Sequence, residues 1–456
     1  MFNFGLSGIV PYVMYGAGIC AFFLSILWKP IIGVYYLVPL IPLQTLRYKL
    51  IGFPLGQSVV DIILLGVLVG LLIRSRTIFV STPWNRILNV YCFYTFVSLC
   101  LGSFYLHRPL PLWLSDSRLA DWKNYMVMPL LLFVVAASIE EKGQIRVILW
   151  LMMFAILALN RDFWDTVGGR NYSDFSYDLR DAGGMGYAGV NGLAAFEAQA
   201  CVWLLALAAF EKRWRTCIVY WSLAGFSAVC LMFSLSRGGY LAVLVGCLFL
   251  GLVKQRKLLI LLAIFLATWA SLVPPAVRQR VFMTYDKNTH ELDHSSETRV
   301  NLWEEAMQIY DTNPLVGAGF YTYAYTSHYN GYKDTHNLFV KVLVETGVLG
   351  LLLFLWLLVK TFTSGYQLFR QSEDPFLCSI GLGLATWLVC AFVANLFGDR
   401  WTYLQVNGFM WVLAGLVSRS LLFEEEAARI KRDQLVVSDN VTAPTGSPEP
   451  SPALVV

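Results

Sequence analysis

His336 is the residue of this chain whose type and position most directly suggest chemistry. His336 and Asn337 are followed by nine residues and then by Gly-Val-Leu-Gly at 347–350, where a long polar segment gives way to an apolar one. A histidine titrates near neutral pH, so at the mouth of a helix it can act as a general base. Asn337, Lys341 and Glu345 recur every four residues and should share one stripe of that helix. The alternative is that His336 only caps the helix at the membrane interface.

Arg237 is the second such residue. It stands in Ser-Leu-Ser-Arg-Gly-Gly at 234–239, which interrupts two apolar segments. A guanidinium is always charged and offers a fork of donors that matches phosphate oxygens. The two glycines after it would let the backbone approach a ligand closely. The alternative is a tight turn between two helices, with Arg237 extending to the membrane interface.

Arg299 lies in a longer polar region between apolar segments. Apolar side chains recur there at helical intervals: Val300, Trp303, Met307 and Tyr310. This pattern predicts an amphipathic helix, and Asp-Thr-Asn-Pro-Leu-Val-Gly-Ala-Gly at 311–319 predicts the turn that ends it. Arg299 could serve a ligand on this ordered unit, or it could simply pair with Glu297.

The elements that must position these residues are membrane helices. Of 456 residues, 57% are hydrophobic and 14% are charged, whereas soluble proteins carry about 25% charged residues. The apolar residues form blocks of about 17 to 25, the length that crosses about 30 Å of hydrocarbon. We therefore predict an all-α polytopic membrane protein with about 12 or 13 transmembrane helices. The candidate spans are 9–28, 31–46, 58–73, 87–104, 125–139, 146–159, 190–210, 217–235, 239–253, 258–274, 337–360, 377–397 and 403–421.

The composition also argues against two classes of site. The net charge is only +4, and no cluster of Lys and Arg is long enough to indicate binding of nucleic acid. All nine cysteines lie in or beside apolar segments, without the spacing of a metal site. We interpret them as small packing residues rather than as disulfides or metal ligands.

Short basic loops set the expected orientation. Lys and Arg are enriched in cytoplasmic loops, and the densest basic runs are at 212–215 and 254–257. The opposite, non-cytoplasmic side then receives the two largest loops, 160–189 and 274–336. We expect the second of these to contain short helices.

Two domains are expected, and one of them carries an unusual charge pattern. Residues 1–422 form the transmembrane domain, and residues 423–456 form a cytoplasmic tail that is largely disordered after a charged helical start. The predicted non-cytoplasmic side is rich in arginine, which the positive-inside rule disfavours. These arginines are Arg108, Arg118, Arg161, Arg170, Arg180, Arg237, Arg278, Arg280, Arg299 and Arg400. An anionic ligand on that face would account for them. The alternative is ion pairing with aspartates of the same loops, namely Asp162, Asp165, Asp174, Asp178 and Asp181.

The order of these motifs on one membrane side resembles the O-antigen ligase and O-antigen polymerase family of bacterial envelope proteins. The matching marks are Ser-Arg-Gly at 236–238, Arg299-x-x-x-Trp303 with Pro-Leu-Val-Gly at 314–317, the His-Asn-x9-Gly-x-x-Gly signature at 336–350, and Gly-Val-Asn-Gly-Leu-Ala at 189–194. By motif the resemblance covers about residues 160–360. By the pattern of spans it covers the whole chain.

The resemblance implies a membrane glycosyltransferase with a GT-C-like fold in the bacterial inner membrane. Such proteins take a glycan from undecaprenyl diphosphate on the periplasmic face and pass it to a hydroxyl of an acceptor glycan, of lipid A core or of a protein. Arg237 and Arg299 would bind the diphosphate, and His336 would act on the acceptor. No metal or cofactor is expected. The resemblance does not separate ligase from polymerase, nor does it identify the sugar.

Four residues are assigned supporting roles: Asn337, Lys341, Glu345 and Arg280. Two features depart from the family pattern. Loop 274–336 holds three further histidines, His290, His294 and His328, so His336 is chosen by its place in the motif alone. Most of loop 160–189 has no evident counterpart.

Two other functions remain as alternatives. A transporter of a small anion or sugar would also be polytopic, but no inverted repeat is evident. Asp61 and Glu197 are the clear acidic residues within the predicted spans. Two such residues are weak support for a transporter that couples transport to an ion. A non-catalytic scaffold of an envelope assembly complex is the third possibility. Only the transferase would release undecaprenyl diphosphate from a lipid-linked glycan.

The expected orientation can be tested with reporter fusions. A reporter that works only in the periplasm should be active when fused near Lys287 and silent when fused near Lys254, because positive loops stay cytoplasmic. The opposite result would invert the topology and remove the basis for a periplasmic site.

Overall fold

The computed structural model describes residues 6–283, 294–326, 331 and 333–442. Their regular elements are all helices, with no strand in these ranges, which confirms the predicted all-α class. The first eight α-helices are α1 (Leu6–Leu27), α2 (Ile31–Leu40), α3 (Gln44–Tyr48), α4 (Val59–Ile73), α5 (Asn85–Tyr105), α6 (Ser117–Ser138), α7 (Lys142–Val167) and α8 (Gly189–Ala208). The next eight are α9 (Trp214–Phe233), α10 (Arg237–Val253), α11 (Arg256–Leu272), α12 (Pro275–Phe282), α13 (His294–Thr312), α14 (Leu338–Gln371), α15 (Pro375–Asn395) and α16 (Leu404–Thr442). Short 3-10 turns are η1 (Gly56–Ser58), η2 (Tyr177–Leu179), η3 (Gly183–Ala188) and η4 (Tyr323–Tyr325).

The number of membrane-crossing helices is lower than the 12 or 13 predicted. Ten helices of the described chain are long and apolar enough to cross, or 11 if the bent pair α11 and α12 counts as one span. Every predicted span coincides with a helix, but α2 has 10 residues and α10 has 17. At 1.5 Å per residue, α2 is about 15 Å long, roughly half of the hydrocarbon thickness. An apolar run alone therefore overstates the crossing length where a proline, here Pro39, falls inside it.

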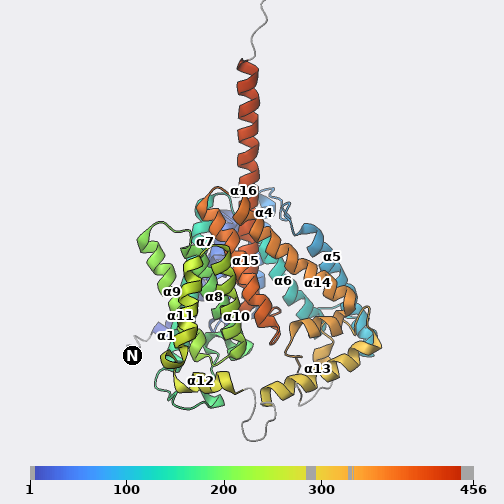
Figure 1. Ribbon diagram of the computed structural model, residues 1–456. Coiled ribbons are helices and arrows are strands. Elements are labelled where there is room, and N and C mark those ends of the chain that lie inside the picture. The colour runs from blue at the N-terminus through green and yellow to red at the C-terminus, as the bar shows by residue number, and fades with distance from the viewer. Residues whose placement is uncertain (1–5, 284–293, 327–330, 332, 443–456) are drawn as a thin grey trace, which may run out of the picture.

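The basic loops gather at one end of the helix bundle. Arg76 Nη2 lies 2.7 Å from Glu140 Oε1, which joins the loops that precede α5 and α7. Lys254 Nζ lies 4.3 Å from the centre of the Phe210 ring, which joins the two densest basic runs. α16 leaves the bundle alone and continues as one helix past the predicted domain boundary at residue 422 (Figure 1). The final residues, 443–456, lie outside the described residues.

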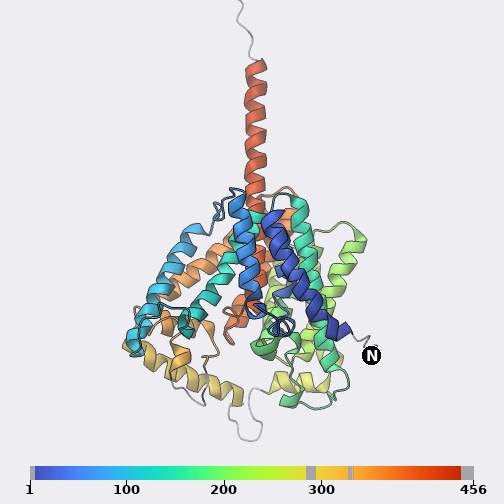
Figure 2. The ribbon, with the colours of Figure 1, turned by 180° about the vertical axis from the view of Figure 1, so that it is seen from behind.

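The two large loops meet at the opposite end. α12 and α13 lie across that end of the bundle (Figures 1 and 2). The backbone N–H of Phe175 donates to Gln279 Oε1 at 2.8 Å, and Gln279 Nε2 donates to Asp174 Oδ1 at 2.9 Å. The backbone N–H of Ala276 donates to the carbonyl of Tyr172 at 3.1 Å. The loop between α7 and α8 is thus fastened to α12, one of the short helices expected in loop 274–336.

The turn after α13 interlocks with a break in α14. At Gly347 the backbone leaves the helix, with φ 64° and ψ −173°, a region that is almost closed to other residues. The N–H groups of Ala318 and Gly319 donate to the carbonyls of Val344 and Glu345 at 2.9 and 2.8 Å. In return, Val348 N–H donates to the carbonyl of Pro314 at 3.0 Å, and Leu349 N–H donates to that of Leu315 at 3.2 Å. Two motifs recognised separately in the sequence are therefore one paired structure.

Glycine is required where these two segments cross. A Cβ on Gly347 would lie 2.2 Å from the Leu315 carbonyl oxygen, and one on Gly317 would lie 2.5 Å from the backbone of Glu345. Such distances are far inside van der Waals contact, and the opposing atoms are main chain, which cannot move aside.

Gly347→Ala should therefore destabilise the protein by about 1–3 kcal/mol from backbone strain alone, and the clash should add to this. Thermal unfolding of purified protein in detergent measures the effect. Gly225→Ala in α9 is the matched control, since no atom lies within 4 Å of its added Cβ, and alanine favours a helix. Equal melting temperatures for the two variants would contradict the interlock.

Candidate functional site

A cavity of about 280 Å³ opens among the ends of α8, α10, α12, α13 and α15. Its lining includes five arginines: Arg180, Arg237, Arg280, Arg299 and Arg400. Asn191, Ser236 and Ser296 add neutral polar groups, and the described lining residues include no carboxylate. Guanidinium groups that converge in this way form a site for an anion with several oxygens, such as a phosphate group.

The glycines beside Arg237 serve helix packing. A Cβ on Gly239 would lie 2.8 Å from that of Ala194 in α8, and one on Gly238 would lie 3.1 Å from the side chain of Phe397. The start of α10 can therefore approach α8 and the end of α15 closely. Arg237 Nη1 donates to the carbonyl of Met283 at 2.8 Å, so the arginine also fastens α10 to the residue after α12. Gly238 and Gly239 also line the cavity, so the close approach of backbone to a ligand, predicted from the sequence, stays a prediction beside this packing role.

Asn191 organises one wall of the cavity. Its Oδ1 accepts from Arg180 Nη2 at 2.7 Å and from Ser236 Oγ at 2.9 Å. Burial, together with the neighbouring positive charge of Arg280, lowers the pKa of Arg180 to about 10. The group still carries its charge at neutral pH, and a bound anion would relieve the repulsion.

Arg280 is held by aromatic rings of the loop between α7 and α8. Its guanidinium carbon lies 5.0 Å from the centre of the Phe175 ring and 5.6 Å from that of Tyr177. Such contacts orient a cation without neutralising it. The loop without an evident family counterpart therefore supports the cavity.

His336 lies just before α14, in an unusual backbone conformation. Its φ is 53°, in the left-handed region that residues other than glycine rarely adopt. The indole Nε1 of Trp303 donates to the carbonyl of Thr335 at 2.9 Å, so α13 fixes the backbone next to the histidine. This contact accounts for the tryptophan of the Arg-x-x-x-Trp motif.

Asp334 faces His336. Its Oδ2 lies 3.5 Å from His336 Nδ1, and its Oδ1 accepts from the His336 backbone N–H at 3.2 Å. Burial raises the pKa of Asp334, but the hydrogen bond from His336 and the charge of Lys341 outweigh it, so that pKa lies well below its usual range. The carboxylate is therefore ionised at neutral pH.

Asn337 acts as the N-cap of α14. Its Oδ1 accepts from the N–H groups of Phe339 and Val340 at 2.9 and 3.3 Å. The capping role that the sequence left open for His336 is thus filled by its neighbour.

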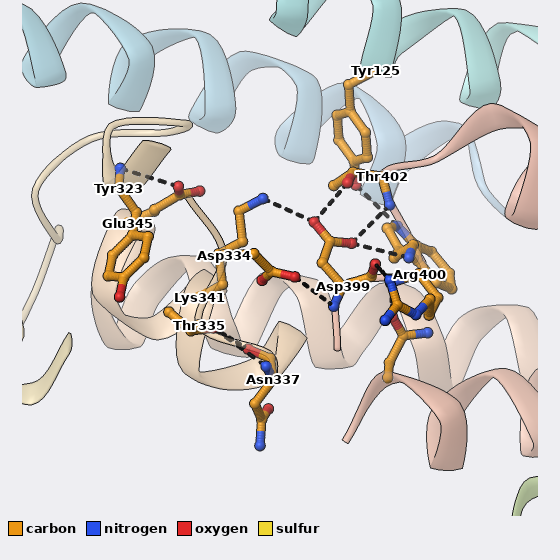
Figure 3. A network of polar contacts seen from close by, with 12 residues as sticks. Tyr125, Tyr323, Asp334, Thr335, Asn337, Lys341, Glu345, Asp399, Arg400 and Thr402 are labelled. Atoms are coloured by element: carbon orange, nitrogen blue, oxygen red, sulfur yellow. Dashed lines mark hydrogen bonds and ion pairs between the residues drawn. The ribbon is translucent and has the colours of Figure 1, made fainter. Parts of the chain in front are cut away.

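Lys341 and Glu345 belong to a buried polar network (Figure 3). Lys341 Nζ lies 2.8 Å from Asp399 Oδ2, and these side chains are only 7% and 2% exposed. Thr402 Oγ1 donates to the same oxygen at 2.6 Å. Glu345 Oε1 accepts from the backbone N–H of Tyr323 at 3.3 Å, which ties α14 to η4.

The turn between α15 and α16 connects this network to the cavity. Asp399 N–H donates to Asp334 Oδ2 at 3.4 Å, and the next residue, Arg400, lines the cavity. The structure thus places Arg237, Arg280 and Arg299 in one cavity lining. The remaining predicted site residues, His336, Asn337, Lys341 and Glu345, lie outside that lining. The α15–α16 turn links their segment to the cavity through the contacts of Asp399 with Lys341 and Asp334.

Sequence reasoning left five residues of this region without a role: Arg180, Asn191, Asp334, Asp399 and Arg400. Arg180 and Arg400 appeared only as members of the arginine-rich face, and Asn191 only within a motif. Nothing in the sequence pairs Asp399 with Lys341, because 58 positions separate them. Of the other histidines, His290 and His328 lie outside the described residues.

Comparison with known families matches residues 222–355 to the family described as O-antigen ligase. This match confirms the resemblance read from the motifs and indicates a membrane glycosyltransferase of the O-antigen ligase or polymerase type. Arg180 and Arg400 lie outside the matched range. No curated protein matches the chain.

The cavity should bind inorganic diphosphate. Losing one charged hydrogen-bonding group costs about 1.5–3 kcal/mol, so Arg299→Gln or Arg237→Lys should weaken binding about 10- to 100-fold. The lysine variant should fail because a point charge cannot reproduce the guanidinium fork.

Titration calorimetry of the purified protein with diphosphate, without added metal, measures this affinity. Arg161→Gln is the control, because Arg161 is 62% exposed and pairs with Asp165 in its own helix. Binding that is equal in all four proteins would reject the cavity as the anion site.

Proposed function

We propose that the protein transfers a glycan from undecaprenyl diphosphate to an acceptor hydroxyl on the periplasmic face of the inner membrane, because residues 222–355 match the family described as O-antigen ligase. The observation that carries this proposal is the convergence of five arginines on one cavity, a single turn away from His336 and its carboxylate partner. A lipid diphosphate is an activated leaving group, and its transfer needs cations for the departing charge and a base for the incoming hydroxyl.

Each part of the site has a distinct role in the proposed step. Arg237 and Arg299 bind the diphosphate, and Arg280, with Arg180 and Arg400, adds positive charge to the same cavity. Asn337 caps α14 and so holds His336 at the helix mouth. Lys341 and Glu345 fix this helix against the α15–α16 turn and η4.

The reaction is a single displacement. The acceptor oxygen attacks the sugar C1 and gives its proton to His336 Nε2 as the new C1–O bond forms. The bond between C1 and the phosphate oxygen breaks, and its electron pair leaves with the diphosphate, whose charge the arginines stabilise. Attack opposite the leaving group inverts the configuration at C1. No step is assigned to a metal ion.

The orientation of the site follows from the charge distribution. The basic loops gather at one end of the bundle and the arginine cavity lies among the large loops at the other. Because basic loops tend to stay cytoplasmic, this arrangement supports a periplasmic cavity. The donor lipid then reaches the cavity from the bilayer, and the acceptor glycan, lipid A core or protein reaches His336 from the periplasm.

His336→Ala should lower transfer by about 10² to 10⁴, the usual contribution of a general base, and should leave donor binding largely intact because the arginines hold the diphosphate. The measurement is release of undecaprenyl diphosphate and formation of the glycosylated acceptor by purified variants, with donor binding assayed alongside. The matched controls are His290→Ala, His294→Ala and His328→Ala, which should keep most activity.

Two results would reject these roles. One is transfer by His336→Ala at the wild-type rate. The other is loss of donor binding in His336→Ala while Arg237→Ala and Arg299→Ala retain it. Movement of glycan across the membrane without release of undecaprenyl diphosphate would instead favour a transporter.

A further inference from the structure

We propose that Asp334 is the positioning residue of His336, whose ring it orients through Nδ1 and whose backbone it holds through the N–H group. The inference rests on the proposed function, in which His336 is the base. Asp334 itself touches neither substrate.

The geometry assigns both carboxylate oxygens of Asp334 to this task. Oδ1 accepts from the backbone N–H of His336 at 3.2 Å, and Oδ2 lies 3.5 Å from Nδ1. One side chain thus contacts the main chain and the ring of the same histidine. His336 needs such support, because its φ of 53° is unfavourable for a residue with a Cβ. Its side chain is 29% exposed, so the ring remains open to a substrate.

Asp334 is in turn held by the turn that carries an arginine of the cavity. Its Oδ2 accepts from Asp399 N–H at 3.4 Å. Asp399 is fixed by Lys341 Nζ at 2.8 Å and by Thr402 Oγ1 at 2.6 Å (Figure 3). Because Arg400 follows Asp399 directly, the same short turn sets the position of the proton acceptor and that of a cation on the leaving-group side.

Several charged or titratable groups surround the pair. Lys341 comes from α14, Asp399 and Arg400 come from the α15–α16 turn, and two tyrosines contribute, Tyr323 of η4 and Tyr403 beside α16. All of them remain in Asp334→Asn, which removes one charge and keeps the size of the side chain. The variant therefore removes the carboxylate that faces His336 Nδ1 and leaves these neighbouring groups in place.

The first test does not depend on catalysis. Diethylpyrocarbonate modifies imidazole, and peptide mass spectrometry reports the modification rate of each histidine at one fixed pH. In Asp334→Asn the rate at His336 should rise, because the ring loses the carboxylate that lies 3.5 Å from Nδ1 and holds it in one orientation. Asp311→Asn, which changes an exposed aspartate of α13, should leave the rate at His336 as it is in the wild type. An unchanged rate in Asp334→Asn overturns the pairing.

The second test is kinetic. Asp334→Asn should lower kcat by about 10- to 1000-fold, part of what a general base provides, with KM for the lipid-linked donor within about threefold of wild type. Asp334→Glu, which keeps the charge, should recover part of kcat, and Asp311→Asn should behave as wild type.

The outcomes separate this inference from the proposed function. Wild-type kcat in Asp334→Asn, together with an inactive His336→Ala, overturns the positioning role and leaves the transferase standing. A raised modification rate at His336 in Asp334→Asn, in a protein that transfers no glycan even as wild type, supports the pairing and rejects the proposed function. A higher KM with unchanged kcat in Asp334→Asn also overturns the role, because it would place Asp334 in substrate binding.

Discussion

The backbone pairing between the turn after α13 and the break in α14 is the constraint on which the site depends. Four hydrogen bonds join residues 314–319 to residues 344–349. They form only because Gly317 and Gly347 carry no Cβ. The short first section of α14 is thereby separated from the long membrane helix and fixed against the large loop. That section sets the orientation of His336, Lys341 and Glu345. The backbone pairing therefore determines where these polar side chains lie.

The charges at this end of the bundle oppose folding locally, and the surrounding contacts offset them. Converging guanidinium groups repel one another, and burial of Arg180 adds a desolvation penalty. The buried pair of Lys341 and Asp399 need not be more stable than an apolar pair of the same size. Functional sites often contain charge arrangements that are unfavourable by themselves and that neighbouring contacts stabilise. This end of the protein fits that pattern, whereas the α8 and α15 core is mainly apolar and tightly packed.

The sequence predicts the class of fold and the main motifs because both depend on local patterns. Apolar length identifies the helices, and the spacing from Arg299 to Trp303 and from His336 to Gly350 identifies ordered turns. The crossing count was too high because apolar composition does not report where a helix stops, as at α2. Asp399 and Arg400 were missed as partners because their contacts join segments far apart in the chain. Asp334 was missed although it is two residues from His336, because its contact depends on the left-handed backbone of His336, which the sequence does not reveal. The packing role of Gly238 and Gly239 was missed because only the structure shows α8 and Phe397 beside them.

In the proposed reaction, the arginine cavity and His336 act on opposite sides of the sugar C1. The cavity stabilises the departing diphosphate, and His336 takes the proton of the incoming hydroxyl. A cryo-electron microscopy structure of the protein with a non-hydrolysable analogue of a lipid diphosphate-linked sugar tests this most directly. We expect density for the diphosphate of the analogue between Arg237 and Arg299. The sugar C1 should be directed towards His336 Nε2, across the α15–α16 turn. Diphosphate bound away from the arginine cavity, or a sugar directed away from His336, would contradict it.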